Sequence, residues 1–474
     1  MSVEKIAIIG LDSVPPSILF DKLLDKLPNI KRMYNSGIHG SLETCHPPIT
    51  VPAWMVMMTG KNPGKLGIYG FRHRRGFSYN DGYIVNSTHV KEKTVWEILA
   101  ENKIKSVILG VPPSYPPKPI ENCNIVSCFI TPSQEKDFTY PQTLKQEILD
   151  IANGKYIFDV TFRIEDRDNL KKELFEMTEK RFDVAEYLAK NKPWQFFMMH
   201  EIGFDRLHHA FWKFFDPTHP KYVSGNKYER IDEEYYAMVD SRIGRLLEIF
   251  GEDCLTFVLS DHGSKGMHGA FCVNQWLEKE GYLKFRSKPS SVTDLDKAEI
   301  DWTKTKAWGW GGYYARIFFN VKGRESQGVI KPEKLEDEKR KLVQKMMKIR
   351  DDKGRTMLNQ VLEPDKLYGT ATGDKPDLMV YFDELNWRSA GTVGHDSIYL
   401  SENDTGPDDS VHSMDGVFLM FNPQRNMNSS IIEGAKVEDI APTLLKLFGV
   451  DGGLKTEYGR MDGRVLEKVV TALG

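Results

Sequence analysis

Short, almost continuous apolar runs recur along this chain, and they limit its fold more than any other feature of the sequence. They are KIAIIGLD (5–12), KSVILGVPP (105–113), WQFFMMHEIG (194–203), LTFVLSDHG (255–263), DLMVYF (377–382) and GVFLMF (416–421). Runs of this length suit strands that are covered on both faces by other structure. Several of them stop at an acidic or proline residue, which marks the end of the strand.

Amphipathic stretches with helical spacing lie between these runs. Apolar residues recur in this way over 170–188 and again over 231–250, where Gly251 is a candidate helix C-cap. Alternation of strands and helices predicts an α/β sandwich with a mostly parallel central sheet and helices on both faces. The chain of 474 residues is long enough for a large core with insertions.

Two regions interrupt this alternation. Residues from about 130 to 190 are charged and mainly helical in pattern, and residues 275–405 are rich in Lys, Asp and Gly and contain WGWGGYY (308–314). We therefore expect residues 1–274 and 406–474 to form the core, with a helical insertion near 130–190. We expect residues 275–405 to form a cap over the site.

Charge and cysteine content restrict the partners and the compartment. Lys plus Arg (64) against Asp plus Glu (67) gives a net charge of −3, which argues against stable nucleic-acid binding. The five cysteines are scattered without a CxxC pair, a pattern that favours a reducing compartment over a disulfide framework. No apolar stretch approaches the length of a membrane span, and the N-terminal run is too short for a signal peptide. A cytoplasmic location is the resulting expectation.

Three acids come directly after buried strands: Asp12, Asp205 and Asp261. In an open α/β sheet the carboxyl ends of the strands form the ligand crevice, so these carboxylates are predicted to meet at one edge. Asp205 and His209 are four residues apart in FDRLHHAFW, which places both on one face if the segment is helical. His208 is a competitor, but the spacing favours His209.

Two further histidines complete the set of candidate metal ligands. His262 follows Asp261 at a strand end, and His412 lies just before the run GVFLMF. The mixture of imidazole and carboxylate suits zinc first and manganese second, and it suits calcium less well. Three carboxylates with two divalent ions sum to about +1, a charge that attracts a phosphate ester and can stabilise its in-line transition state.

Thr50 is the candidate nucleophile. It precedes Pro52 and AWMVMMTG, which resembles a helix that starts near the proline and ends at Gly60. A hydroxyl at a helix N-terminus lies beside free N–H groups and the positive end of the helix dipole, where an anion binds. A divalent ion can convert this weak nucleophile into an alkoxide.

At these residues the chain resembles the alkaline phosphatase superfamily, in particular its type I phosphodiesterase/nucleotide pyrophosphatase branch, which includes predicted phosphohydrolases and phosphomutases. The motifs that carry the resemblance are GLDSVPP, ITVPAWMVMMTGKNPGKLGI, FDRLHHAFW, LSDHG and VHSMDG, in that order, followed by VEDIAPTLLKLFGV (437–450). The resemblance spans nearly the whole chain and is weakest in the cap and around 130–190. It implies an alkaline-phosphatase-like sandwich with an inserted cap.

The resemblance also implies how the ligands divide between two metal ions. Asp205, His209 and His412 would hold one ion. Asp12, Asp261 and His262 would hold the other, together with Thr50. Ala53 stands where family members that act on nucleotides often have Asn, a departure that argues against nucleotide pyrophosphatase activity but not against hydrolysis.

Other residues are candidates for contacts with the substrate. Arg72 in FRHRRG and Lys265 in DHGSKG could bind an anion, and Trp308 and Trp310 could stack on a base or sugar in the leaving group. Each has a structural alternative, in a solvated loop or a packed turn. His268 and His395 are weaker candidates from flanking loops.

The predicted function is two-metal hydrolysis of a small phosphate diester or monoester through a phosphothreonine at Thr50. A phosphomutase and a non-catalytic metal-binding protein are the alternatives. TGKNPGKLG lacks the spacing of a P-loop, and Leu66 stands where Ser or Thr is needed. Cys45 is followed by HPPI without the arginine of a sulfatase motif, and no GxGxxG follows a strand.

Overall fold

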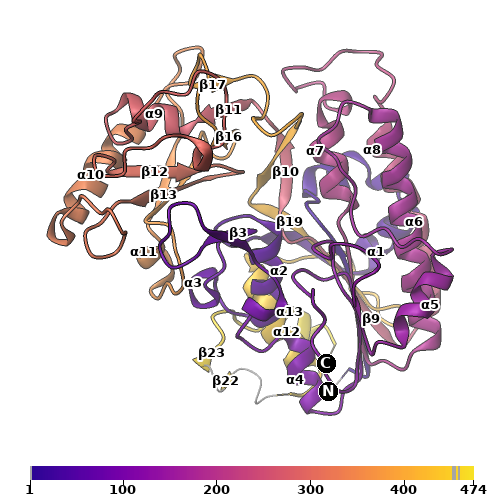
Figure 1. Ribbon diagram of the computed structural model, residues 1–474. Helices are drawn as coiled ribbons and strands as arrows, with labels where there is room; N and C mark the ends of the chain where they lie inside the picture. Colours follow the sequence, from indigo (N-terminus) through magenta and orange to yellow (C-terminus); the bar gives the residue numbers. More distant parts are fainter. Residues whose placement is uncertain (1–2, 451–454, 457–458, 474) are drawn as a thin grey trace.

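A ten-stranded sheet forms the centre of the protein (Figure 1). The computed structural model describes residues 3–450, 455–456 and 459–473. The strands run in the order β20-β2-β19-β9-β1-β8-β5-β6-β7, with β21 also paired to β2. Their bounds are β1 Lys5–Leu11, β2 Ile38–Glu43, β5 Ser106–Leu109, β6 Cys123–Val126, β7 Thr139–Tyr140, β8 Phe196–Glu201, β9 Cys254–Leu259, β19 Asp415–Phe421, β20 Ser430–Ile431 and β21 Ala435–Lys436.

The predicted α/β sandwich with a mostly parallel sheet is confirmed. The five adjacent strands β9, β1, β8, β5 and β6 are all parallel to one another. β19 is antiparallel to both of its neighbours, β2 and β9, and β7 is antiparallel to β6. Parallel alignment brings the carboxyl ends of β1, β8 and β9 to one edge, which is where the acids of the sequence motifs follow.

Side chains of the central strand β1 alternate between two hydrophobic cores. Ala7, Ile9 and Leu11 belong to the core on one face of the sheet, and Ile6 and Ile8 to the core on the other. Fully burying an aliphatic side chain of this size stabilises the fold by about 1.5–3 kcal/mol, so both faces must be covered. This explains why the run KIAIIGL is apolar throughout rather than alternating.

Helices cover each face of the sheet. The first face carries α1 (Pro28–Ser36), α5 (Leu144–Ile151), α6 (Arg167–Asn191), α7 (Gly203–Phe215) and α8 (Ile231–Phe250). The second face carries α2 (Thr50–Thr59), α3 (Pro63–Leu66), α4 (Val95–Glu101), α12 (Ile440–Leu447) and α13 (Glu467–Thr471). The helices expected over 170–188 and 231–250 are therefore α6 and α8, and Gly251 caps α8 at a φ of 83°. α6 packs against α7 and α8 as part of the main helical layer.

A second lobe, drawn mainly in orange in Figure 1, stands beside the main sheet. It contains an antiparallel sheet of four strands in the order β12-β13-β15-β14 and a three-stranded sheet β16-β11-β17. The run DLMVYF forms β15 of this lobe and not a strand of the central sheet. The elements of the lobe are α9 Val273–Lys279, α10 Leu335–Met346, α11 Pro364–Tyr368, β11 Gly269–Cys272, β12 Ala307–Trp310, β13 Ala315–Phe319, β14 Gln360–Leu362, β15 Leu378–Tyr381, β16 Trp387–Ala390 and β17 Tyr399–Leu400.

One antiparallel ribbon connects the two parts. The chain leaves the main sheet along β10 (Gly263–Gly266) and returns along β18 (Ser410–Ser413), which pair with each other. Gly263 is required here, because an added Cβ would lie 2.2 Å from the carbonyl oxygen of Asp415. The division at 275–405 stays a prediction, although β11 already pairs with strands of the second lobe.

Two small hairpins complete the described chain: β3 (Arg72–Arg74) with β4 (Gly82–Ile84), and β22 (Lys455–Thr456) with β23 (Gly459–Arg460). All five cysteines are buried and unpaired. Among the described residues, no helix combines the length and the apolar character that crossing a membrane requires. The predicted compartment stays a prediction.

Candidate metal centre and nucleophile

The first set of candidate ligands lies at the carboxyl ends of two neighbouring strands. Asp12 directly follows β1, and Asp261 and His262 follow β9 by one turn. The Nε2 atom of His262 lies 3.3 Å from Oδ2 of Asp261 and 3.6 Å from Oδ1 of Asp12. None of the three side chains is exposed to solvent. One cation could therefore contact all three residues in a closed site.

Two hydrogen bonds fix the orientation of Asp12. Its Oδ2 atom accepts from the indole Nε1–H of Trp54 at 3.0 Å and from Nε2 of His200 at 2.7 Å. His200 is neutral, because burial lowers its pKa to about 3. The Trp54 ring needs Gly10, since a Cβ there would lie 2.5 Å from the ring. Gly10 thus leaves space for the Trp54 ring, and Trp54 in turn fixes the orientation of Asp12, a candidate metal ligand.

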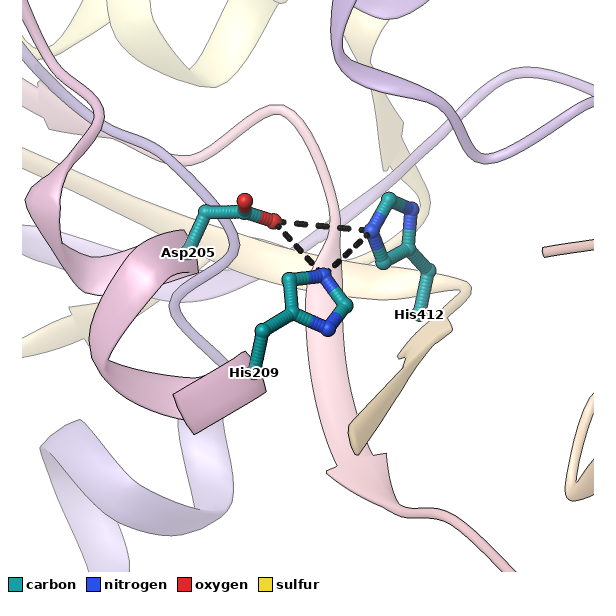
Figure 2. Close-up of side chains that lie close together, drawn as sticks. All are labelled: Asp205, His209 and His412. Carbon is teal, nitrogen blue, oxygen red and sulfur yellow. Dashed lines mark hydrogen bonds and ion pairs between the residues drawn. The ribbon is translucent and has the colours of Figure 1, made fainter. Parts of the chain in front are cut away.

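The second set combines a helix and a strand. Asp205 and His209 lie one turn apart on α7, and His412 lies on β18. Figure 2 shows their side chains pointing toward one another. Nε2 of His209 is 3.2 Å from Oδ1 of Asp205 and 3.3 Å from Nε2 of His412. Nε2 of His412 is 3.5 Å from Oδ1 of Asp205. The i, i+4 geometry predicted from FDRLHHAFW is present in the helix.

Neighbouring groups set the orientation of these ligands. Nδ1 of His412 donates to the carbonyl oxygen of Pro48 at 2.7 Å, which leaves the Nε2 lone pair facing the set. Nδ1 of His209 lies 2.7 Å from Oδ1 of Asp408. Arg206 donates to Oδ2 of Asp205 at 2.5 Å. Such outer partners fix the tautomer and direction of metal-binding side chains.

The two sets are in direct contact, and Thr50 lies beside the first. The rings of His262 and His412, one from each set, stack with their centroids 4.0 Å apart. Oγ1 of Thr50 is 3.4 Å from Nε2 of His262 and 3.5 Å from Oδ1 of Asp12. The hydroxyl that the sequence singled out is therefore within reach of a cation held by the first set.

The N-terminus of α2 presents Thr50 as expected from its sequence. Thr50 is the first residue of the helix, Ile49 is the N-cap, and Gly60 ends the helix in the left-handed region at a φ of 64°. The first intrahelical bond of the turn runs from Ala53 N–H to the Ile49 carbonyl at 2.9 Å. Pro52 has no N–H, so the N–H groups of Thr50 and Val51 remain at the helix end, where an anion can bind.

The electrostatics of the two sets differ. In the first set, burial raises the pKa of Asp12 to about 7 and raises the pKa of Asp261 well above its usual range. In the second set, burial also opposes ionisation of Asp205, but His209 and Arg206 together hold its pKa well below the ordinary value. Burial lowers the pKa of His209 less than Asp408 and Asp205 raise it, so its pKa lies well above the ordinary value.

Two buried carboxylate oxygens indicate that the residues present fit two cations. Oδ1 of Asp205 and Oδ2 of Asp261 lie 3.2–3.3 Å from imidazole nitrogens, but neither accepts a hydrogen bond from the described residues. A buried carboxylate oxygen without a partner costs free energy unless a cation or proton neutralises it. One such oxygen occurs in each set, beside imidazole nitrogens that face it. Two carboxylates with one imidazole, and one carboxylate with two imidazoles, are suitable ligand sets for divalent transition metals.

The other sequence candidates lie outside these sets. His208 contacts Ser264 and Tyr236, and Lys265 donates to the carbonyl oxygen of Glu384. His395 contacts Thr392, and the exposed His268 donates its backbone N–H to the carbonyl oxygen of Asn386.

The predicted substrate contacts also lie apart from the two sets. Trp308 is completely buried in the core of the second lobe, so it presents no free ring face for stacking. Trp310 and the exposed Arg72 line a groove beside this lobe.

Three residues next to the site were not singled out from the sequence. Asp408 is hydrogen-bonded to His209, and His200 is hydrogen-bonded to Asp12. Tyr313 stacks on His412 with ring centroids 3.9 Å apart. Tyr313 belongs to the run WGWGGYY, in which Trp308 and Trp310 were the predicted substrate contacts. Asp408 could have been found by its position four residues before His412, in DDSVH.

The sheet, with two ligand sets meeting at its carboxyl edge, defines an alkaline-phosphatase-like protein. The sequence matches the family described as type I phosphodiesterase/nucleotide pyrophosphatase over residues 6–408. The chain therefore belongs to this family and is a phosphoric ester hydrolase. Among curated proteins, none matches the sequence.

Solved structures show the same fold at low sequence identity. Human ectonucleotide pyrophosphatase/phosphodiesterase 5 is 13% identical, with a TM-score of 0.58 over 99% of each chain. The murine protein of that name is 13% identical, with a TM-score of 0.53 over 94% of this chain and 95% of that one. An inactive threonine-to-alanine variant of the murine protein, in complex with AMP, is 14% identical, with a TM-score of 0.54 and the same coverage.

Proposed function

We propose that this chain hydrolyses a small phosphate diester or monoester through a phosphothreonine formed at Thr50. The observation that carries the proposal is the position of the Thr50 hydroxyl at a helix N-terminus, 3.4–3.5 Å from two ligands of the first set. The inactive murine neighbour, in which a threonine is replaced by alanine, supports a catalytic threonine in this fold.

Two divalent cations would complete the site, with zinc the first candidate and manganese the second. Asp12, Asp261 and His262 would hold one, and Asp205, His209 and His412 the other. When bound, such ions favour ionisation of a nearby hydroxyl and neutralise the charge that develops on the phosphoryl group. The pair of buried carboxylate oxygens that accept no hydrogen bond from the described residues, one in each set, supports this assignment.

The residues of the chain would then perform two displacements. The Thr50 hydroxyl gives up its proton to solvent and its oxygen forms a bond to phosphorus, while the bond from phosphorus to the leaving alcohol breaks and the alcohol takes up a proton from solvent. A water molecule next attacks the phosphorus of phosphothreonine, which restores the Thr50 hydroxyl and releases the phosphate product. The N–H groups of Thr50 and Val51 lie at the end of α2, where they can hold a phosphoryl oxygen.

Ala53 affects the choice of substrate. It is buried on α2, one turn beyond Thr50, and it offers no polar atom to a phosphoryl oxygen. Because nucleotide-specific relatives often have Asn at this position, we place simple phosphodiesters and phosphomonoesters ahead of nucleotide pyrophosphates as substrates.

A phosphomutase remains the second candidate. In a mutase the phosphoryl group of phosphothreonine returns to an acceptor on the substrate, so water must be kept out of the site. The completely buried ligand sets are compatible with such exclusion. Release of inorganic phosphate, measured against formation of an isomeric ester, separates the two. Membership of a family of hydrolases favours both enzymes over a non-catalytic metal-binding protein.

The decisive experiment is replacement of Thr50. Metal-stripped protein is reloaded with zinc or manganese and assayed on p-nitrophenyl monoesters and diesters. Thr50→Ala should lower turnover by at least about 10³-fold, because the nucleophile is lost, while metal content stays near two ions per chain. Thr50→Ser, which keeps the hydroxyl, should retain measurable activity. Turnover by Thr50→Ala at the wild-type rate would refute the assignment of the nucleophile.

A further inference from the structure

A groove of about 680 Å³ lies between the β3–β4 hairpin and the second lobe. Its lining includes two arginines and four aromatic residues: Arg72, Arg316, Tyr79, Tyr83, Trp302 and Trp310. Part of the aromatic wall is already ordered without a ligand, because the rings of Tyr79 and Trp302 stack with centroids 3.9 Å apart. A hollow of this size, with apolar walls and a few charged groups, is typical of a small-molecule site.

Arg72 and Arg316 have no acidic partner among the described residues. Arg316 donates to the backbone carbonyl of Arg72, and its guanidinium lies over the Trp310 ring at 5.1 Å. The neighbouring Arg74 is different, because it pairs with both Glu325 and Asp374. Burial lowers the pKa of Arg316, and the nearby positive charges of Arg72 and Arg74 lower it further. The two arginines thus keep N–H donors that no carboxylate of the described residues accepts, and such donors can bind an external anion.

Two acidic residues also line the groove. They are Asp294 and Asp296, and Asp294 pairs with Lys297 at 2.6 Å. The lining itself is formally balanced, with two arginines and two aspartates, and Lys297, which pairs with Asp294, adds a third positive charge next to it. Neither aspartate forms a salt bridge with Arg72 or Arg316 within the described part of the chain.

The β12–β13 hairpin connects this groove to the metal-ligand sets. Trp310 and Arg316 face each other across the hairpin, and Tyr313 lies in the turn between them. Tyr313 stacks on His412, and its ring also lies 5.0 Å from that of His209. Three residues of chain span at most about 10 Å, so the backbones of Arg316 and Tyr313, the residue that contacts the second set, lie within that distance of each other.

We propose that the groove binds an anionic group, a phosphate or carboxylate, carried by an ester substituent of the substrate. The proposal rests on the proposed function, because it places the phosphoryl group of the same substrate at Thr50. Arg72 and Arg316 would form charge-assisted hydrogen bonds to the anion, and the aromatic walls would cover the connecting part of the substituent. The enzyme would then prefer diesters with a second negative charge at a distance from the reacting phosphorus.

Matched synthetic diesters test this preference. We would compare pentyl p-nitrophenyl phosphate with 4-carboxybutyl p-nitrophenyl phosphate, which differ in a terminal carboxylate, and include a choline ester as the cationic counterpart. Wild-type protein should show kcat/KM at least about tenfold higher for the carboxylate ester than for the pentyl ester, because one charge-assisted hydrogen bond contributes about that factor. The choline ester should be hydrolysed more slowly than the pentyl ester.

Substitution of the arginines identifies the groove as the source of the preference. Arg72→Gln changes an exposed side chain, and Arg316→Gln keeps a donor for the Arg72 carbonyl. Each should reduce the carboxylate-to-pentyl ratio of kcat/KM toward 1. Arg355→Gln is the matched control, because Arg355 is an exposed arginine that pairs with Asp351 and does not line the groove. An unchanged ratio in both Arg72→Gln and Arg316→Gln would refute the proposal.

Binding measurements separate failure of this proposal from failure of the proposed function. Pentylphosphonate and 4-carboxybutylphosphonate are titrated calorimetrically into zinc-loaded Thr50→Ala protein, which needs no turnover. Tighter binding of the carboxylate analogue, lost in the double variant with Arg72→Gln, supports the groove even if no ester is hydrolysed. Equal affinity for the two analogues, together with equal hydrolysis of the two esters, would overturn the groove but leave the role of Thr50 intact.

Discussion

The two ligand sets differ in which group holds a proton before a metal binds. In the first set, formed by Asp12, Asp261 and His262, burial raises the carboxylate pKa values and lowers the pKa of His262 to about 3. In the second set the pKa of Asp205 is lowered and that of His209 is raised. The first set thus favours protonated carboxyl groups. The second set favours an ion pair between the Asp205 carboxylate and protonated His209.

This difference follows from what surrounds each set. Asp205 has Arg206 beside it, and His209 contacts Asp408, whose carboxylate is itself paired with Arg163 and Arg388. The hydrogen bonds that Asp12 and Asp261 accept from the described residues come from neutral groups, such as the Trp54 indole and the backbone N–H of Ser13. A cation therefore removes a larger electrostatic penalty in the first set, which is also the set beside Thr50.

Removal of one ligand from each set should have the largest effect. Asp261→Asn and Asp205→Asn should each reduce metal content from two ions to one per chain and lower turnover by about 10³-fold, because each ion stabilises charge in the transition state. Elemental analysis and p-nitrophenyl ester hydrolysis measure the two effects. If either variant lost both ions, the sets would bind cooperatively and the comparison would have to be revised.

A second test separates the sets through Asp408. Asp408→Asn should weaken metal binding at the second set by about 10–100-fold, because His209 loses the carboxylate that orients it, and should leave the first set unchanged. Competition with a chromogenic chelator gives both affinities. Asp409→Asn is the matched control, since Asp409 is also buried but its side chain pairs with Lys213. Equal losses in the two variants would mean that Asp408 acts only on stability.

The dependence on pH should also distinguish the sets. Burial raises the pKa of Asp12 from 3.8 to about 7, so the unfolded chain ionises more readily than the metal-free fold. The stability that Asp12 contributes to the metal-free protein is therefore present below pH 3.8 and is lost as pH rises through 7. A bound metal needs the ionised carboxylate, so its affinity should rise with pH below 7, by up to about tenfold per unit for one proton.

Thermal unfolding of metal-free and zinc-loaded protein between pH 5 and 8 measures this dependence. The increase in Tm on adding zinc should grow with pH in the wild type. It should grow less in Asp12→Asn, which has no carboxyl proton to lose. An increase in Tm that is independent of pH in the wild type would contradict the raised pKa of Asp12.

The smallest expected effect is that of removing the hydrogen bond from Trp54 to Asp12, a ligand of the first set. Trp54→Phe keeps a ring in the space that Gly10 leaves but removes the hydrogen bond to Asp12. Because His200 still donates to the same oxygen, metal affinity at the first set should fall only about threefold to tenfold, or about 0.5–1.5 kcal/mol. Chelator competition at fixed pH measures it. A loss as large as that in Asp261→Asn would show that Trp54 positions Asp12 almost alone.

Much of the main sheet and the helix that carries Thr50 could be predicted from sequence. The runs that form β1, β8 and β9 are apolar because both faces are buried, and Pro52 and Gly60 mark the two ends of α2 through local backbone preferences. The periodicity over 170–188 predicts the helix that the structure shows as α6 (Arg167–Asn191), but it does not predict the place of α6 in the main helical layer. Periodicity shows which face of a helix is buried but not what covers it.

The substrate contacts were least accessible to sequence analysis. Trp308 and Trp310 of WGWGGYY were candidates for stacking on the substrate, with a packed turn as the alternative. Trp308 is fully buried, and it is Tyr313 of this run that stacks on His412. The run DLMVYF has the same apolar pattern as β1 and β9, but it lies in the second lobe. Side chains in these segments are placed by contacts with residues far away in the chain, which short-range patterns do not encode.

The sequence alone determined which residue types could bind metal and where strands and helices would end, because those depend on side-chain chemistry and local backbone preference. Only the tertiary structure decided that His262 and His412, 150 residues apart, would stack at 4.0 Å, and that Asp408 would hold His209. Burial, and therefore every shifted pKa in the site, is a property of the packed fold, since it depends on how much water the surrounding chain excludes.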